Sequence, residues 1–233
     1  MGPYSHIVIA HELETFIKPD NTQEYYWGAV APDVRYVVDG MTKKHTHLSA
    51  EEIKTYMHKY PLLMDFLNGY MVHCLSDKLS LRTIIRQKFP FSLIKNRITK
   101  NNCTIILEFL NIELIKTTKK FLPGKNNPVL RELGVSDWSA TKYSQNINRY
   151  INSPSYTSSI TLYQNLGFKV GRRVEKYHSV VQSWQHSWIK KNLVLIRPQL
   201  RKMNREIAAS IKTQISNVLL EKEKSVKYHK VVI

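Results

Sequence analysis

His73 and Asp77 lie four residues apart in an apolar stretch that begins near Pro61. On a helix with 3.6 residues per turn, side chains at this spacing project from one face and can reach a single ion. A neutral imidazole and a carboxylate together suit zinc or another borderline divalent metal. Cys74 points about 100° away from His73 on such a helix, and we interpret it as a packing residue. The pair indicates a metal site, although chance pairs at this spacing are common.

His45 and His47 follow a turn and are separated by one residue. In an extended segment, residues at this spacing share a face, so both could bind one ion, or one could support the other from outside the coordination shell. Two solvated loop histidines would show the same spacing. Asp33 follows Pro32, which restricts the local backbone and would hold the carboxylate in one direction. A turn or a helix cap is the alternative role for Asp33.

Other histidines have weaker positional signals. His6 lies at the start of a predicted helix, from which it could point back toward a packed bundle. His11 and His178 are further possible ligands or supporting residues, and His178 lies in an aromatic-rich segment where packing is the alternative role. His58 has lysine neighbours on a charged helix, and we predict that it is solvated.

Four short motifs follow one another along the first third of the chain. They are Ser5-His6, then Gly28-Ala29-Val30-Ala31-Pro32-Asp33, then Thr46-His47, and then Gly69-Tyr70-Met71-Val72-His73-Cys74-Leu75-Ser76-Asp77. In this order and spacing they resemble the zinc-dependent phospholipase C family, whose superfamily also includes the zinc-dependent single-strand nucleases. The resemblance covers roughly residues 1–80.

The resemblance implies an all-helical fold with a metal cluster between helices. Asp33, His47, His73 and Asp77 would surround one zinc ion, and Asp77 would bridge to a second zinc ion that His6 also holds. In such a centre the metal acidifies a bound water, which attacks phosphorus while the phosphate oxygens are held. Asp33 could serve as the general base that orients this water. The expected cofactor is one or two zinc ions.

The chain departs from the family after Asp77. In the family another histidine, often in a His-Pro pair, and then an H-x-x-x-E motif supply a further zinc site. Here the next histidine is His178. The position four residues after it, where the family motif has a glutamate, holds Gln182, a neutral amide. We therefore expect the outermost zinc site of the family to be absent, which leaves a reduced centre that either stays catalytic or has drifted to other chemistry.

The charge is distributed unevenly. The formal net charge is +17, yet residues 1–90 hold ten basic and ten acidic residues, whereas residues 91–233 hold 25 and eight. Six of the nine histidines lie in the neutral part. A strongly basic segment indicates an anionic partner, such as nucleic acid, a phosphorylated small molecule or lipid, or an acidic membrane surface. A solvated, lysine-rich surface is the alternative.

Residues 169–205 carry ten lysines and arginines against a single acidic residue, Glu175. Aromatic residues are interleaved with these charges, as in proteins that stack single-stranded bases. The same charges could steer a phosphorylated substrate toward the metal site or contact acidic lipid head groups. We predict an anion-steering role for Arg172, Arg173, Lys190 and Lys191.

Helical signals dominate the chain, and no segment shows sustained strand alternation. We predict helices at residues 6–17 (capped by Ser5), 50–59 (capped by Ser49), 62–85, 102–121, 137–152, 155–166, 170–193 and 198–224, with a long irregular connection at residues 19–48. The predicted fold is a single all-α bundle over residues 1–233, of the zinc-dependent phospholipase C type. Residues 1–90 form its metal-site part and residues 91–233 its basic helical part.

Three functions compete. The first is a metal-dependent hydrolase of an anionic phosphodiester or phospholipid-like substrate. The second is a biosynthetic enzyme that uses the same metal as a Lewis acid, and the third is a basic nucleic-acid-binding module without catalysis. No apolar run approaches the roughly 20 residues that span a bilayer, no secretory signal is evident, and two cysteines do not form a disulfide framework. We therefore expect a cytoplasmic protein.

Overall fold

The architecture is that of a computed structural model, which describes residues 2–87, 100–115, 121–167 and 191–229, together with residues 175, 178, 179 and 182. Every element in this part of the chain is a helix, so the predicted all-α class is confirmed. The helices are α1 (Pro3–Ile17), α2 (Thr22–Gly28), η1 (Ala31–Val37), α3 (Lys43–Thr46), α4 (Ala50–Lys59), η2 (Pro61–Leu63), α5 (Met64–Gln87), α6 (Lys100–Leu114), α7 (Pro128–Glu132), α8 (Asp137–Asn152), α9 (Tyr156–Asn165) and α12 (Leu193–His229).

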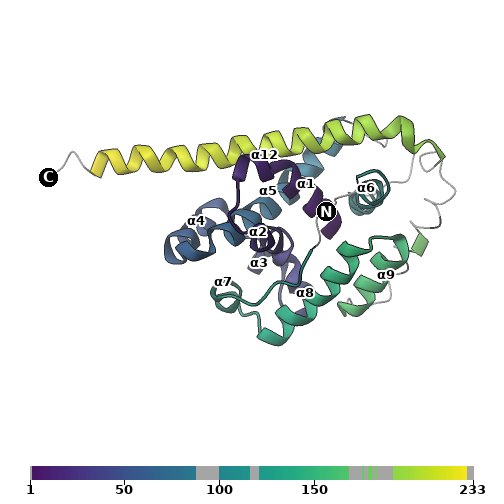
Figure 1. Cartoon of the computed structure of the whole chain (residues 1–233), viewed down its shortest axis with the longest axis horizontal. Helices are drawn as coiled ribbons and strands as arrows, with labels where there is room; N and C mark the ends of the chain where they lie inside the picture. Colours follow the sequence, from purple (N-terminus) through teal and green to yellow (C-terminus); the bar gives the residue numbers. More distant parts are fainter. Residues whose placement is uncertain are drawn as a thin grey trace.

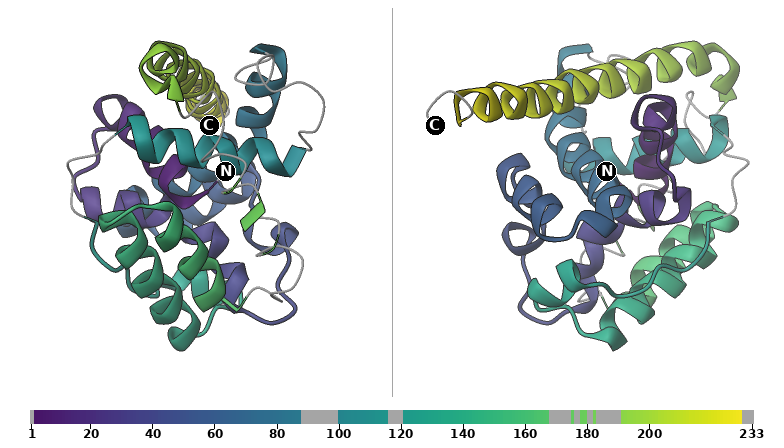
Figure 2. Two further views of the ribbon diagram at one scale, coloured as in Figure 1. Left: turned by 90° about the vertical axis from the view of Figure 1, so that its right-hand side faces the viewer. Right: turned by 60° about the vertical axis from the view of Figure 1, so that its left-hand side comes forward.

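Helix α5 is the central element. It packs against α1, α2, α4, α6, α12 and η1. The long α12 crosses α1 and α5 on one side of the molecule, and α8 and α9 lie together on the other side (Figure 1). The turned views show the same arrangement, with α12 passing over the ends of the inner helices (Figure 2). Because α5 carries both His73 and Asp77, the surrounding helices determine what can reach these two side chains.

Helices α2 and α5 cross in direct backbone contact. A Cβ atom added at Gly28 would lie 1.9 Å from the Phe66 carbonyl oxygen, and one added at Gly69 would lie 1.9 Å from the Tyr25 carbonyl oxygen. No real side chain tolerates such separations, so only glycine at both positions permits this approach. The two glycines of the sequence motifs thus serve the packing of α2 on α5.

Buried tyrosines fix the connections that follow α2. The Tyr70 hydroxyl on α5 donates to the Thr46 carbonyl at the end of α3. The Tyr143 hydroxyl on α8 donates to the Val30 carbonyl at a distance of 2.8 Å, just before η1. Each bond satisfies a backbone acceptor in a short connection that lacks regular partners. As a result, the segments that carry His47 and Asp33 are held by helices distant in sequence.

The start of α1 is anchored by a carboxylate from α6. Glu108, which is fully buried, accepts hydrogen bonds from the backbone N–H groups of Tyr4 and Ser5 at 2.8 Å each. The Ser5 and Tyr150 hydroxyls donate to the same carboxylate at 2.6 Å each. A negative charge at a helix N-terminus pairs with the exposed N–H groups and with the helix dipole. Glu108 therefore fixes α1 one residue before His6.

Two predicted helices have the bounds expected from the sequence. Helix α4 begins after Ser49, which forms a capping box with Glu52, and α8 spans Asp137–Asn152 after Ser136. The predicted segment 155–166 corresponds closely to α9. In each case a serine side chain accepts from a backbone N–H of the first turn, which is a local signal that the sequence displays directly.

Other predicted bounds were wrong. Ser5 does not cap α1, because the helix starts at Pro3 and its N–H groups bind Glu108 from another helix. The connection 19–48 is not irregular but contains α2, η1 and α3. Helix α6 ends at Leu114, and α7 was not predicted. Helix α12 begins at Leu193 and continues through Pro198, since a proline near a helix start removes only one internal hydrogen bond.

The predicted helix 170–193 lies almost entirely outside the described residues. Among the helices that the structure does describe, none has the length and apolar composition required to cross a bilayer.

Replacing Gly69 by alanine should force α2 and α5 apart, because the added methyl group meets a backbone carbonyl rather than a movable side chain. We expect the free energy of unfolding, measured by urea denaturation, to fall by about 1–3 kcal/mol or more, the usual cost of overpacking. The neighbouring Asn68→Ala substitution on the same helix is the matched control and should cost much less. Equal stability of the two variants would contradict a close crossing.

Candidate metal centre

Five of the predicted site residues meet between α1, η1, α3 and α5. His6 comes from α1, Asp33 from η1, His47 from the residue that ends α3, and His73 and Asp77 from α5. They form two overlapping groups, His6–Asp33–His73 and His47–His73–Asp77, and within each group the possible ligand atoms lie within 4.8 Å of one another. His6, Asp33 and His73 are buried, whereas His47 and Asp77 are partly exposed.

The tautomer of His73 follows from its hydrogen bond. Its Nδ1 lies 2.8 Å from the carbonyl oxygen of Ala29, which can only accept, so Nδ1 carries the proton. In the neutral ring the lone pair is therefore on Nε2. This nitrogen lies 3.2 Å from Nε2 of His47. The close crossing at Gly28 brings the Ala29 carbonyl within reach, so packing of α2 on α5 decides which nitrogen of His73 faces the centre.

His6 is oriented in the same way by Ser76. The Ser76 hydroxyl donates to the carbonyl of His73 at 2.9 Å, so its oxygen accepts from Nδ1 of His6 at 2.8 Å. The Nε2 lone pair of His6 then points at Oδ1 of Asp77, 3.4 Å away, and this buried nitrogen has no hydrogen-bond partner among the residues that the structure describes. The rings of His6 and His73 stack with centroids 3.8 Å apart.

Asp77 lies between two histidines. Its Oδ1 faces Nε2 of His6, and its Oδ2 lies 3.1 Å from Nε2 of His47. The other ring nitrogen of His47, Nδ1, lies 3.2 Å from the Thr46 hydroxyl. All three histidines of the centre thus turn Nε2 inward and engage Nδ1 with a group outside it. This is the arrangement in which protein groups around a metal site orient its histidine ligands.

Two cations contact the two carboxylates. The Arg35 guanidinium donates to Oδ1 of Asp33 at 2.8 Å, and the Lys43 ammonium donates to Oδ2 of Asp77. Arg35 also lies over the Tyr36 ring, with 4.0 Å between its Cζ and the ring centroid, and its Nε is buried without a hydrogen-bond partner in the described part of the chain. Each carboxylate is therefore matched by a positive group at the edge of the centre.

Burial governs the protonation of the inner histidines. It lowers the pKa of His6, although the nearby carboxylate of Asp77 partly offsets the shift. It lowers the pKa of His73 still further, and the neighbouring rings of His6 and His47 add to this effect. Burial alone would raise the pKa of Asp77, but nearby positive charge and the hydrogen bond with His47 bring it well below its usual value. Neutral imidazoles facing a carboxylate follow from these shifts.

These residues fit a divalent metal ion. The Nε2 lone pair of His6 is buried, unpartnered and directed at a negatively charged oxygen, a repulsive contact that a cation between them would convert into attraction. The donor set consists of imidazole nitrogens and carboxylate oxygens, which suits borderline divalent metals.

The structure does not bring the remaining predicted histidines to the centre. The ring of His45 is exposed and lies 3.0 Å from the backbone nitrogen of Thr42, at the start of α3. His11 is exposed on α1, where its Nδ1 lies 3.2 Å from the Tyr26 hydroxyl. His178 is exposed and belongs to neither group of possible ligands, and His58 is exposed as predicted.

The predicted anion-steering residues are mostly beyond what the structure describes. Arg172, Arg173 and Lys190 lie outside the described residues, and Lys191 is exposed just before α12. A basic groove is nevertheless found on α12. It has a volume of about 600 Å³ and is lined by Val194, Arg197, Pro198, Arg201, Lys202, Arg205, Glu206 and Ala209.

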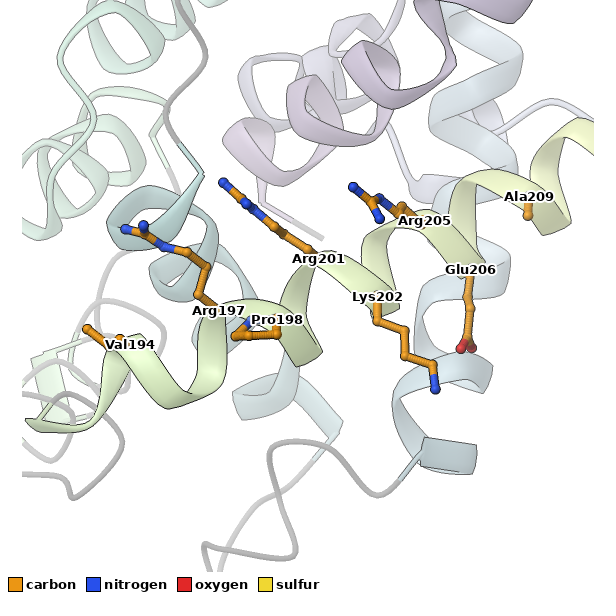
Figure 3. A pocket seen from close by; sticks show the side chains of 8 residues that line it. All are labelled: Val194, Arg197, Pro198, Arg201, Lys202, Arg205, Glu206 and Ala209. Atoms are coloured by element: carbon orange, nitrogen blue, oxygen red, sulfur yellow. The ribbon is translucent and has the colours of Figure 1, made fainter.

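The arginines of this groove project in one row. Arg197, Arg201 and Arg205 extend from the same side of α12, whereas Lys202 and Glu206 extend from another side (Figure 3). Their spacing of four residues corresponds to a rise of about 6 Å between neighbours along the helix. Within the part of the chain that the structure describes, no carboxylate forms an ion pair with these three arginines. The groove therefore concentrates positive charge, because its lining residues include four cations and one carboxylate, Glu206.

Several residues of the centre were missed by sequence reasoning. Ser76, Arg35 and Lys43 contact the ligand candidates directly, and Glu108 anchors α1 beside them. Glu108 had a usable signal, because it is an acidic residue inside the apolar run of α6. Arg35 and Lys43 had none, since a charged residue two or four positions from a ligand candidate is ordinary on any surface.

We compared the chain with family models, with curated proteins and with solved structures, and none of them matches it.

Metal-free protein should lose stability as the pH falls below the unfolded histidine value of about 6.5. Because the folded pKa of His6 and of His73 is lowered, the unfolded chain binds protons first, and unfolding becomes easier with each added proton. Each ring contributes up to about 1.4 kcal/mol per pH unit. Asp77 adds acid sensitivity only below its unfolded value of about 3.9, so the window from pH 6.5 to 4.5 reports the histidines.

Urea denaturation of chelator-treated protein across this window measures the effect. His58→Gln, at an exposed site, should leave the slope unchanged, whereas His73→Gln should reduce it. A free energy of unfolding that stays level from pH 6.5 to 4.5 would show that the inner histidines are not held neutral.

Proposed function

We propose that the centre binds zinc and that the protein is a metal-dependent phosphoester hydrolase. The observation that carries the proposal is the common orientation of three histidines around Asp77, each with Nε2 turned inward and Nδ1 engaged elsewhere. A purely structural histidine cluster has no need for an unpartnered inner nitrogen facing a carboxylate. Imidazole and carboxylate donors favour zinc among the common divalent ions.

The reaction class is supported by the sequence motifs. The four motifs that resemble those of the zinc-dependent phospholipase C family supply all five inner residues: His6, Asp33, His47, His73 and Asp77. Zinc bound there would acidify a water molecule and offset negative charge on a phosphoryl group. We assign to Asp33 the role of general base, which accepts the proton of the attacking water.

The environment of Asp33 suits this role. Its side chain is almost fully buried, and its possible ligand oxygen lies within 4.8 Å of a ring nitrogen of His6 and of a ring nitrogen of His73. Arg35 donates to one carboxylate oxygen and so fixes the direction of the other. A carboxylate held in this way needs little reorganisation before it accepts a proton.

Zinc content and hydrolysis test the proposal together. We expect stoichiometric zinc in wild-type protein by elemental analysis, and a sharp loss of zinc in His73→Ala and Asp77→Ala, with circular dichroism to verify folding. Asp33→Asn should cut the hydrolysis of p-nitrophenyl phosphate or bis(p-nitrophenyl) phosphate by about 10²- to 10⁴-fold. His58→Gln is the matched control and should change neither quantity.

Each outcome separates the competing functions. Zinc without hydrolysis of either ester would favour the biosynthetic enzyme that uses the metal as a Lewis acid. Absence of zinc from folded wild-type protein, even after incubation with zinc salts, would exclude a metal enzyme and leave the basic binding module.

A second candidate function rests on the groove of α12. We propose that its row of arginines binds the phosphates of a single nucleic-acid strand. Arginine pairs with phosphate through two parallel N–H groups, and a concave surface with unbalanced positive charge concentrates anions. The described lining residues include no aromatic ring, so binding would depend on phosphates rather than on base stacking.

Fluorescence anisotropy with a labelled oligothymidylate tests this function. Binding should weaken steeply with salt, with a log–log slope of roughly −0.7 for each phosphate neutralised. Arg201→Gln with Arg205→Gln should flatten the slope by roughly 1.4, as expected for two lost contacts. The control pair Lys44→Gln with Arg149→Gln removes two exposed charges elsewhere and should have little effect. The same response from both pairs would mean that only net charge matters.

A further inference from the structure

Each carboxylate of the centre has a cation of its own. Asp33 binds Arg35, and Asp77 binds Lys43. Among the described side chains of the centre, each of these two carboxylates is paired with a cation. Both carboxylate charges are therefore already matched by side-chain cations before any ion enters the centre.

A divalent ion would upset this balance. It would take up the negative charge of Asp33 and Asp77 and leave Arg35 and Lys43 without counter-charges, so that two positive charges would be in excess. Excess charge in a largely buried site is costly, and an anion that fills the open side restores the balance. A dianion matches the excess created by one divalent ion better than a monoanion does.

The positions of the two cations define where such an anion would lie. The Arg35 side chain is 16% exposed, and its buried Nε has no hydrogen-bond partner. The Lys43 side chain is 53% exposed, and Lys43 lies four residues before His47, on the same side of the short segment that carries this histidine. The two donors therefore stand at an inner and an outer position, and an anion can approach from the side of Lys43.

We propose that Arg35 and Lys43 form a binding site for a phosphoryl dianion, and that this site becomes available when a divalent ion occupies the centre. The inference rests on the proposed function, and it narrows the substrate class to phosphomonoesters. Lys43 exchanges its bond with Asp77 for a bond with a phosphoryl oxygen, while the unpartnered Nε of Arg35 gains an acceptor.

Phenylphosphonate, a non-hydrolysable dianion, is the probe. Isothermal titration should detect its binding to zinc-loaded protein but not to metal-free protein, and the monoester ethyl phenylphosphonate should bind at least about tenfold more weakly. Since linkage is reciprocal, phenylphosphonate should raise the zinc affinity by the same factor by which zinc raises the affinity for phenylphosphonate.

Lys43→Gln provides the sharpest variant, because its two effects should have opposite signs. Loss of a positive charge should raise the zinc affinity, measured by competition with a chromophoric chelator, and should weaken phenylphosphonate binding by about tenfold. A purely structural role of Lys43 would lower both affinities. Lys44→Gln, at the adjacent exposed position, is the control and should alter neither. Arg35→Lys, which keeps the charge, should retain more phenylphosphonate binding than Arg35→Gln.

The results distinguish this inference from the function on which it rests. Stoichiometric zinc with no binding of phenylphosphonate would overturn the anion site and leave the metal centre intact. Equal binding to metal-free and zinc-loaded protein, or equal binding of the dianion and the monoester, would overturn the charge argument. Absence of zinc binding would overturn both.

Discussion

The backbone contact between α2 and α5 is the constraint on which the candidate centre depends. Gly69, His73 and Asp77 follow one another at intervals of four residues, so the stripe of α5 that packs against α2 continues into the stripe that presents the ligands. Because Gly28 and Gly69 lack Cβ atoms, the end of α2 comes close enough for the Ala29 carbonyl to fix the His73 ring. The same stretch of chain then leads into η1 and Asp33. One packing contact thus determines both the tautomer of one histidine and the place of an acid.

A second constraint acts on His6 through the residue that precedes it. Glu108, Asn111 and Asn204 form a buried chain of hydrogen bonds that joins α6 and α12 to Ser5, the residue before His6. Buried polar groups are costly unless they are paired, and these hydrogen bonds pair most of the groups concerned, with Oδ1 of Asn204 left without a partner among the described residues. Nε2 of His6 is another buried atom without a partner in the described part of the chain, and a bound ion would use it.

The sequence predicted the class of fold because helical signals are local, whereas the set of five inner residues came from the resemblance of four short motifs to the zinc-dependent phospholipase C family. The i,i+4 relation of His73 and Asp77 is a property of any helix, and the serine caps of α4 and α8 are visible within four residues. The start of α1 was predicted wrongly, since its capping group, Glu108, lies more than a hundred residues away. The contacts of Arg35 and Lys43 likewise depend on how η1 and α3 fold against α5, which no local pattern encodes.

The centre has a buried inner side and a more exposed outer side, and this difference in burial determines from which direction a ligand can reach it. His6, Asp33 and His73 are sealed by the helices, whereas His47 and Asp77 lie nearer the surface and Lys43 stands largely in solvent. The outer side is carried by α3, a helix of four residues that is held through the Tyr70 hydroxyl bond to Thr46. A rigid inner set of candidate ligands combined with a tethered outer segment would let the centre hold an ion firmly and still admit a ligand from one direction. Access to the centre is thus a property of α3 and its anchor, not of the long helices that build the fold.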